Sequence, residues 1–235
     1  MPNRKIVSRE KWLAAREVLL AKEKEFTRAR DKLSAERRAL PWVEVDKSYV
    51  FDGPSGKETL SDLFDGKSQL LVYHFMYGPD WDEGCKSCSF WADNYDGIDV
   101  HLKHRDVTLI TVSSAPLATL EAYKKRMGWS FKWVSSAGAD FNGDYQVSFT
   151  PEQQKAGPIF YNYEMRSFPS TEAPGISVFA KDERGTVYHT YSCYARGLDM
   201  LNGAYHMLDL VPKGRDEAAL PHSMAWLRHR DRYDD

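Results

Sequence analysis

The chain has 235 residues, of which 42% are hydrophobic, 28% charged and 13% aromatic. This composition suits one large domain with a buried core and is too apolar for a disordered protein. Its 32 basic and 34 acidic residues leave a net charge of −2, so no overall positive field favours nucleic acid or an anionic membrane. The charged N-terminus has no apolar stretch behind it, and no apolar run approaches the ~20 residues of a membrane span. We therefore expect a cytoplasmic protein with neither nucleic acid nor a membrane as partner.

The segment from Ser8 to Leu40 contains no Gly or Pro and repeats apolar residues at alternating spacings of three and four. This pattern predicts one long amphipathic helix. Ser8 suits the N-cap, and Pro41 ends the helix because proline disfavours helical geometry in the residue before it. Residues 1–40 carry a net charge of +6 and the rest of the chain −8. This complementarity favours docking on the same chain or on a second copy, and we expect a homodimer through this N-terminal helix.

The chain then alternates strand-like and helix-like segments. Val43 to Phe51 is strand-like, and Gln69 to Tyr77 is apolar nearly throughout, as in a strand buried on both faces of a parallel sheet. Lys86 to His104 can form a helix, and Asp106 to Ser113 a second buried strand. Pro116 to Met127 is typical of a helix with proline in its first turn. This βαβα order predicts a parallel sheet with right-handed crossovers.

The segment from Phe131 to Thr171 is rich in Gly, Ser, Asn and aromatic residues. We interpret it as an insertion, with short strands at Phe131–Val134 and Tyr145–Phe149. Gly175–Lys181 and Thr186–Ser192 flank a turn that contains Gly and Asp, and this arrangement predicts a β-hairpin. The hairpin would follow the insertion directly.

The last regular element expected is a helix near Leu198–Leu208. Residues 213–235 are charged, and we expect them to form a tail packed on the surface. The predicted organisation is therefore a helical extension at residues 1–40, an α/β domain at residues 41–212 and the tail.

The three cysteines are too few for a disulfide framework, but Cys85 and Cys88 form a Cys-x-x-Cys motif. In a reducing compartment such a pair is typical of a catalytic or metal-binding site. The order of strand, motif, helix, strand, helix, insertion and hairpin matches the thioredoxin fold. A cysteine in the first turn of a helix has its thiolate stabilised by unpaired backbone N–H groups, and a second cysteine one turn on can attack the mixed disulfide. We assign Cys85 as the attacking nucleophile and Cys88 as the resolving thiol.

Two further residues are candidates for substrate binding. Pro174 lies directly before the hairpin, where thioredoxin-like proteins keep a cis-proline that presents backbone groups to an extended substrate. The assignment rests on position, because cis is a minority state of X-Pro bonds. Trp81, four residues before Cys85, resembles the aromatic residue that often flanks such motifs, although it can equally pack under the loop.

Local charges act on Cys85 in both directions. The acidic residues Asp80, Asp82 and Glu83 oppose formation of its thiolate, whereas Lys86 and the helix terminus favour it. The sequence leaves this balance open. A pKa near the free value of ~8.5 would still permit exchange but would argue against a fast peroxide-reducing thiolate.

Two other chemistries compete with exchange. The cysteine pair together with His101 and His104 supplies ligand types for tetrahedral zinc, but a continuous helix would hold the histidines roughly 20 Å from the thiols. We therefore expect no metal and no other cofactor. A peroxiredoxin-type site has Thr three residues before the attacking cysteine, where this chain has Asp82, which weakens that alternative without excluding it.

Two isolated residues have simpler structural interpretations. Cys193, just after the hairpin, is expected to be a small core residue, with an accessory thiol as the alternative. His74 alternates with large apolar neighbours on its strand and is expected to be a hydrogen-bonded core histidine, close enough in sequence to the motif to tune a thiol.

Four stretches carry a resemblance that spans nearly the whole chain. They are SREKWLAAREVLLAKEKEFTRARDKL near the start, RALPWVEVDKSYVFDG (Arg38–Gly53), FMYGPDWDEGCKSCSFWAD (Phe75–Asp93) and HTYSCYARGLDMLNGAYHMLDL (His189–Leu210). With these, the chain closely resembles a bacterial family of thioredoxin-like proteins described as predicted dithiol-disulfide oxidoreductases. The resemblance implies an α/β thioredoxin-like fold, a mixed central sheet flanked by helices, with an N-terminal helical extension. It implies no substrate.

The sequence therefore predicts a thiol-disulfide oxidoreductase that acts on a protein or small-molecule disulfide. A non-enzymatic binding or scaffold protein of the same fold, with structural or metal-binding cysteines, is the first alternative. A thiol peroxidase is the second. The chain departs from thioredoxin itself by its longer Gly78–Gly84 loop and the lack of a Trp-Cys-Gly-Pro-Cys core, so coupling to thioredoxin reductase is not expected.

Overall fold

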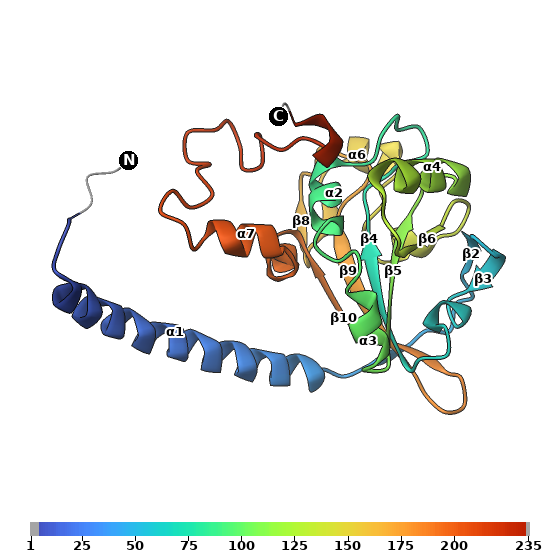
Figure 1. The fold of residues 1–235 in the computed structure, drawn as a ribbon. Coiled ribbons are helices and arrows are strands. Elements are labelled where there is room, and N and C mark those ends of the chain that lie inside the picture. The colour runs from blue at the N-terminus through green and yellow to red at the C-terminus, as the bar shows by residue number, and fades with distance from the viewer. Residues whose placement is uncertain (1–4, 234–235) are drawn as a thin grey trace. The chain divides into compact units, whose positions relative to one another are not determined.

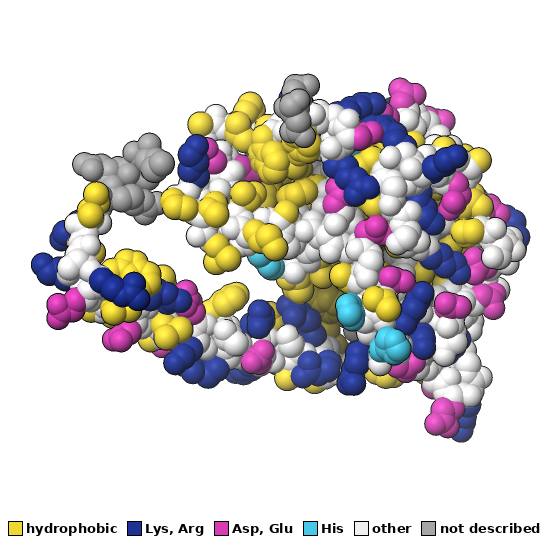
Figure 2. All heavy atoms as spheres, viewed as in Figure 1, with side chains coloured by type: hydrophobic (Ala, Val, Ile, Leu, Met, Phe, Trp, Pro, Cys, Tyr) yellow, Lys and Arg dark blue, Asp and Glu magenta, His cyan; other side chains and the backbone are white. Residues whose placement is uncertain are grey.

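The computed structural model describes residues 5–233. The predicted N-terminal helix is present as α1 (Arg9–Arg38), and the Ser8 hydroxyl accepts the N–H of Lys11 at its start. None of the residues of α1 is buried, and hydrophobic side chains lie exposed between basic ones along it (Figure 2). The chain up to Pro41 forms one compact unit, and the chain from Trp42 on forms another.

The second unit is built on a mixed sheet (Figure 1). The strands β4 (Gln69–His74), β5 (Val107–Ser113) and β6 (Lys132–Ser135) run parallel. On the other side of β4, β9 (Gly175–Lys181) runs antiparallel to it and forms the expected hairpin with β10 (Val187–Tyr194). The spatial order β10-β9-β4-β5-β6 puts β4, which leads into the cysteine motif, at the centre.

Shorter strands extend this sheet at both edges. The expected single strand from Val43 to Phe51 is wrong, because the chain there crosses from one edge to the other. Its first residues form β1 (Val43–Glu44) beside β10, and its end belongs to β2 (Val50–Gly53), which pairs with β6 and with β3 (Gly56–Thr59). A 3₁₀ turn, η1 (Asp62–Phe64), connects β3 to β4.

The helix after the cysteine motif is shorter than expected. Instead of one helix from Lys86 to His104, the structure has α2 (Lys86–Ala92) and α3 (Asp99–Lys103). Gly97, with φ of 83°, lies between them in the left-handed region that a helix cannot pass through. The following helix, α4 (Leu117–Met127), agrees with the prediction and ends at Gly128 in a left-handed conformation.

The segment expected to be an insertion divides into two parts. Its first strand is β6, a full member of the central sheet. The expected strand Tyr145–Phe149 is wrong, since apart from one bridge of Ser148 to Glu172 this stretch is irregular. The remaining elements are short: α5 (Phe141–Asp144), α6 (Pro151–Ala156), and a separate hairpin of β7 (Ile159–Tyr161) and β8 (Glu164–Arg166).

The helix expected near Leu198–Leu208 is also divided. A 3₁₀ segment, η2 (Ala195–Leu201), precedes α7 (Gly203–Leu208). Asn202 separates them, because its side chain accepts the N–H of Tyr205 and so caps the new helix. A last 3₁₀ turn, η3 (Arg230–Arg232), lies in the tail.

Two clusters of buried side chains cover the two faces of the sheet. Tyr73 and Leu109 belong to the first cluster, which includes residues of α2 and α4. Their neighbours Val72 and Ile110 belong to the second, which lies under η1 and α5. This alternation follows from the two-residue period of strands. The chain has a thioredoxin-like α/β fold, and none of its described helices is long and apolar enough to cross a membrane.

Candidate active site

The backbone around the cysteine motif forms a closed loop. The chain continues from the end of β4 to Met76 and returns after Gly84, where the N–H of Cys85 donates to the Met76 carbonyl at 3.1 Å. Cys85 is the N-cap of α2, and its own carbonyl accepts the N–H of Ser89 at 2.9 Å. A β-carbon at Gly84 would lie 2.8 Å from Cε1 of Phe75. Only glycine therefore lets the loop close this tightly.

The two cysteines of the motif are chemically unequal. Cys85 is partly exposed, whereas Cys88 is 2% exposed, and both are free thiols. The thiolate of Cys85 accepts hydrogen bonds from the Cys88 thiol, from the backbone N–H groups of Cys88 and Ser87, and from the Ser87 hydroxyl. These bonds outweigh burial and lower the pKa of Cys85 to about 6. The geometry thus favours a thiolate at Cys85 at neutral pH.

Burial has the opposite effect on Cys88. It raises the pKa of this thiol well above the ordinary value, and donation of the thiol proton to Cys85 adds to the rise. The N–H of Met76 points at the Cys88 sulfur, 3.5 Å away, and the Tyr73 hydroxyl also favours its thiolate. Two donors are therefore in place for negative charge when Cys88 loses its proton.

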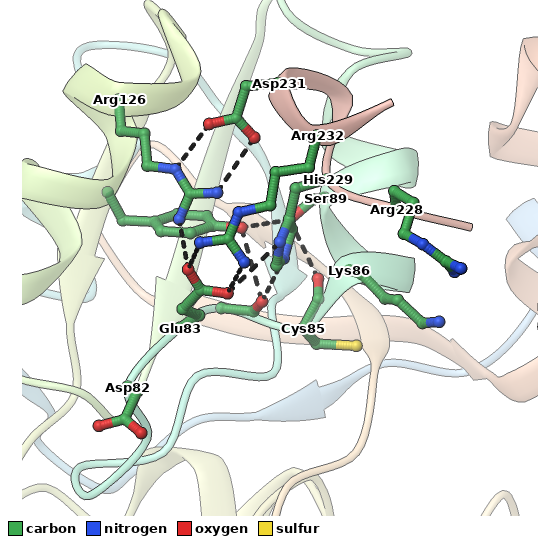
Figure 3. Close-up of polar contacts among 12 residues, drawn as sticks. Asp82, Glu83, Cys85, Lys86, Ser89, Arg126, Arg228, His229, Asp231 and Arg232 are labelled. Carbon is green, nitrogen blue, oxygen red and sulfur yellow. Dashed lines mark hydrogen bonds and ion pairs between the residues drawn. The ribbon is translucent and has the colours of Figure 1, made fainter. Parts of the chain in front are cut away.

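The acidic residues before Cys85 do not act as a group. Glu83 accepts hydrogen bonds from Arg126 at 2.7 Å and from Arg232 at 2.9 Å (Figure 3). Although burial opposes it, these bonds lower the pKa of Glu83. In Figure 3 the Asp82 side chain points away from Cys85, and Asp82 and Asp80 are exposed. The charge expected to oppose the thiolate is thus neutralised or turned to solvent.

The C-terminal tail takes part in this site, which the sequence did not indicate. His229 contacts the Gly84 carbonyl, 2.9 Å from its Nε2, and the Lys86 ammonium donates to the Leu227 carbonyl at 3.0 Å. Arg230 pairs with Asp93 at the end of α2 at 3.2 Å. The tail thereby binds both sides of the motif. Its alternating basic residues were the available signal, but their partners lie too far away in sequence to be paired by pattern.

A cavity of about 480 Å³ opens beside Cys88. Pro174 is part of its wall, and the Pro174 carbonyl accepts the hydroxyl of Tyr161 at 2.8 Å. None of the described peptide bonds is cis, so Pro174 is trans. Trp81 packs on the same buried cluster as Cys85 but is not part of the cavity wall; its ring lies against Gly78. The structure thus places Pro174 beside the motif's buried thiol and Trp81 under the preceding loop.

The remaining candidate residues are His74, Cys193 and the two histidines considered as zinc ligands. His74 is 1% exposed and its Nε2 lies 2.8 Å from the Ser177 hydroxyl, as expected for a core histidine. Cys193 is 8% exposed in the first core cluster. His101 and His104 lie on and just after α3, and within residues 5–233 no three His, Cys, Asp or Glu side chains are grouped so as to hold a metal ion. The proposed zinc ligands are therefore not brought together.

A family model described as bacterial protein of unknown function (DUF899) matches residues 1–233. The chain belongs to this family. No curated protein matches its sequence.

Several solved structures are similar to this one. Peroxidoxin BcpB from Mycobacterium tuberculosis has 9% identity and a TM-score of 0.47, over 70% of this chain and 94% of its own. A putative thiol:disulfide interchange protein DsbE from Chlorobium tepidum has 13% identity and a TM-score of 0.38, over 70% and 97%. A yeast mitochondrial 1-Cys peroxiredoxin has 16% identity and a TM-score of 0.39, over 69% and 74%.

Proposed function

We propose that this protein is a thiol-disulfide oxidoreductase in which Cys85 attacks and Cys88 resolves. The observation that carries the proposal is the inequality of the two thiols. Cys85 is a partly exposed residue and the pKa of its thiol is lowered by donors at the start of α2, whereas Cys88 is buried one turn further on. A nucleophile that is ionised and accessible next to a protected second thiol is what exchange requires.

The reaction has two balanced steps. The Cys85 thiolate attacks one sulfur of a substrate disulfide, so that a Cys85–substrate disulfide forms, the substrate S–S bond breaks and the leaving thiolate takes up a proton from solvent. Cys88 then loses its proton and attacks the Cys85 sulfur, which releases the second substrate thiol. The protein dithiol is oxidised to a Cys85–Cys88 disulfide while one substrate disulfide is reduced to two thiols.

Substrate contacts are proposed for two residues. Pro174 lies in the wall of the cavity next to Cys88, where its backbone can meet an extended substrate. Trp81 lies outside this wall, in the loop before Cys85, with its ring against Gly78. Trp81→Phe keeps an apolar ring at this position. If Trp81 binds substrate, this variant should change the Michaelis constant more than the turnover number.

Cysteine variants test the proposal directly. With hydroxyethyl disulfide as substrate and dithiothreitol as reductant, Cys85→Ser should abolish catalysis, and Cys88→Ser should accumulate a mixed disulfide at Cys85 that mass spectrometry detects. Cys193→Ser, which removes the third thiol, is the matched control and should retain activity. Equal activity in all the variants and the unmodified protein would contradict the proposal.

The reduction potential of the pair separates an oxidoreductase from a scaffold protein. Equilibration in graded thiol–disulfide buffers, followed by alkylation and mass spectrometry, should show a two-electron transition between roughly −120 and −270 mV. A pair that forms no disulfide in any buffer would favour the scaffold alternative, in which the cysteines are structural.

The lowered pKa of Cys85 also favours a second candidate, a thiol peroxidase. A peroxide-reducing cysteine must be ionised at neutral pH, and Cys85 meets that condition. Hydrogen peroxide and the Cys88→Ser variant separate the two functions. A peroxidase would form the Cys85 sulfenic acid orders of magnitude faster than free cysteine does, whereas an exchange enzyme would not.

A further inference from the structure

The cavity beside Cys88 lies close to the attacking cysteine, although Cys85 itself is not part of its wall. The Ser87 hydroxyl donates to the Cys85 thiolate, and Ser87 and Cys88 both belong to the cavity wall. A group that fills the cavity would therefore hold an attached disulfide next to Cys85. This closeness makes the cavity relevant to the reaction and not only to packing.

The wall of the cavity is mostly apolar and comes from separate parts of the chain. Its volume of about 480 Å³ lies in the range of small-molecule sites, roughly 300–1,000 Å³. The pocket is too small for a folded segment of another protein but suits an aromatic or branched apolar group. The apolar side chains of the wall come from α2, η2, the residues just after β4 and β8, and the C-terminal tail: Met76, Trp91, Phe168, Leu198 and Met224.

The inner charges of the cavity are already satisfied within the chain. Arg215 donates to both oxygens of Asp199, at 3.0 and 2.9 Å, and to both oxygens of Asp209, at 2.8 and 2.7 Å. Its guanidinium lies 4.0 Å from the centre of the Tyr205 ring. These groups hold η2, α7 and the following segment together, and they leave little capacity for a ligand.

Glu217 is satisfied in the same way. It accepts the Tyr205 hydroxyl and the Trp226 indole N–H at 2.7 Å each, and the N–H of Met224 at 2.9 Å. Although burial opposes it, these bonds lower the pKa of Glu217. All three bonds go to Oε1, and through this oxygen the carboxylate braces the wall of the cavity.

The two exposed charged side chains in the cavity wall, Arg166 and Arg196, are basic and form only weak ion pairs. The Arg196 side chain is 85% exposed and its ion pair with Asp199 is long, 3.8 Å. The Arg166 side chain is 41% exposed and pairs at 3.2 Å with Glu164, itself 62% exposed. Exposed pairs of this kind are weak, and a guanidinium readily exchanges such a partner for a carboxylate that it can bind through two N–H groups.

We propose that the cavity binds the apolar, carboxylate-bearing half of a small organic disulfide, with the apolar part inside and the carboxylate on Arg166 or Arg196. This rests on the proposed function. The bound disulfide presents one sulfur to Cys85, and the exchange then follows the two balanced steps given above. The protein dithiol is oxidised, and the ligand leaves as two thiols.

Single-turnover reduction of graded disulfides tests this. The fully reduced protein is mixed with dithiobis(nitrobenzoate), which is aromatic and carries carboxylates, with neutral aromatic dithiodipyridine, or with hydroxyethyl disulfide. Each rate constant is divided by the rate constant for reduction of the same disulfide by dithiothreitol, and this ratio is the normalised rate. The normalised rate should be highest for the nitrobenzoate compound and lowest for hydroxyethyl disulfide.

Variants distinguish the contribution of the two exposed arginines from that of the apolar wall. Arg166→Gln with Arg196→Gln should lower the normalised nitrobenzoate rate about tenfold, the effect of losing one charge-assisted contact, and should leave the dithiodipyridine rate unchanged. Phe168→Ala should lower both aromatic rates. Arg184→Gln removes one positive charge in the exposed turn after β9, at the end of that strand remote from Pro174, and should change none of these rates.

A binding measurement supplies a readout without redox chemistry. In the Cys85→Ser, Cys88→Ser double variant, calorimetric titration with naphthoate should show binding at one site, which Arg166→Gln with Arg196→Gln weakens. Equal normalised rates for all three disulfides, or no naphthoate binding, would overturn the cavity proposal while exchange at Cys85 stands. Failure of all three disulfides to oxidise the pair would instead overturn the proposed function.

Discussion

Glu83 and Arg126, which lie on the loop before Cys85 and on α4, form an ion pair of 2.7 Å. Arg126 also binds Asp231 of the tail at 2.7 Å, and Arg232 of the tail binds Glu83 (Figure 3). An acidic residue two positions before the nucleophile would by itself raise the thiol pKa. The pair with Arg126 compensates that charge, and the tail supplies a second basic partner for Glu83 through Arg232.

The first prediction concerns this pair. Arg126→Gln leaves Glu83 less compensated, and the pKa of Cys85 should rise by about half a unit, the size expected for one partly exposed ion pair. The pH profile of Cys85 alkylation, followed by mass spectrometry, measures it. Lys125→Gln makes the same charge change at the exposed neighbouring residue of α4 and should leave the profile in place. An equal shift in both variants would show that only net charge matters.

The second prediction concerns the titration of Cys85 itself. Because donors at the start of α2 lower its pKa to about 6, its thiolate absorbance should appear with a midpoint near pH 6, against about 8.5 for free cysteine. At pH 7 the thiolate fraction would exceed that of free cysteine by about 30-fold. A midpoint at or above 8 would contradict the arrangement described for the site.

Two variants of Cys88 identify the donor responsible. The Cys88 thiol is the largest cause of the lowered Cys85 pKa. Cys88→Ala removes this donor, so the Cys85 midpoint should move upward by about one unit, the worth of one hydrogen bond to a charged group. Cys88→Ser keeps a hydroxyl donor and should stay closer to the original midpoint. Identical midpoints in the two variants would assign the effect to the backbone N–H groups instead.

The third prediction is that the protein is a dimer held by α1. A helix with no buried residue and a stripe of apolar side chains gains stability when that stripe is covered. Sedimentation velocity should show a dimer for the full chain and a monomer after deletion of residues 1–40. Leu33→Asp, on the stripe, should weaken the dimer, whereas Ala35→Asp, on the opposite face of the helix, should not. An unchanged mass after deletion would exclude this mode of association.

The fourth prediction concerns acid stability. Burial lowers the pKa of His74 to about 3, from an ordinary value of 6.5, so only the unfolded chain binds a proton there between these values. The contribution to stability is therefore complete above pH 6.5 and is lost as the pH falls toward 3, by up to about 1.4 kcal/mol per pH unit. Urea unfolding of His74→Gln should show a shallower loss over this window. His101→Gln, on the exposed surface of α3, is the control and should keep the original slope.

The sequence predicted the helices and strands correctly where their bounds depend on residues that are close in sequence. The boundaries of α1, α4 and the hairpin of β9 and β10 agree with prediction to within a few residues, because caps, prolines and residue periodicity act over one or two turns. The predictions failed where one residue's conformation interrupts a pattern, as at Gly97 between α2 and α3. They also failed at Val43–Phe51, where one strand-like run serves both sides of the sheet.

For the candidate site, too, some features could be predicted from the sequence and others could not. That Cys85 begins a helix and Cys88 lies one turn later could be read from the spacing and from the strand before it. The inequality of the two thiols could not, because it depends on how deeply each sulfur is buried and on which donors reach it. The sequence left the balance of charges around Cys85 open, and in the structure hydrogen-bond donors lower the pKa of this thiol.

The sequence by itself determined the thioredoxin-like order of elements, the position of the motif and the length of α1, since each depends on patterns that repeat within a few residues. Only the tertiary structure decided the partners of Glu83 and the cavity beside Cys88. Arg126 and Arg232 lie 43 and 149 residues from Glu83, and the cavity wall joins segments from β4 to the last part of the chain. Such contacts form when side chains that are distant in sequence pack together in the folded chain, and no local sequence pattern predicts them.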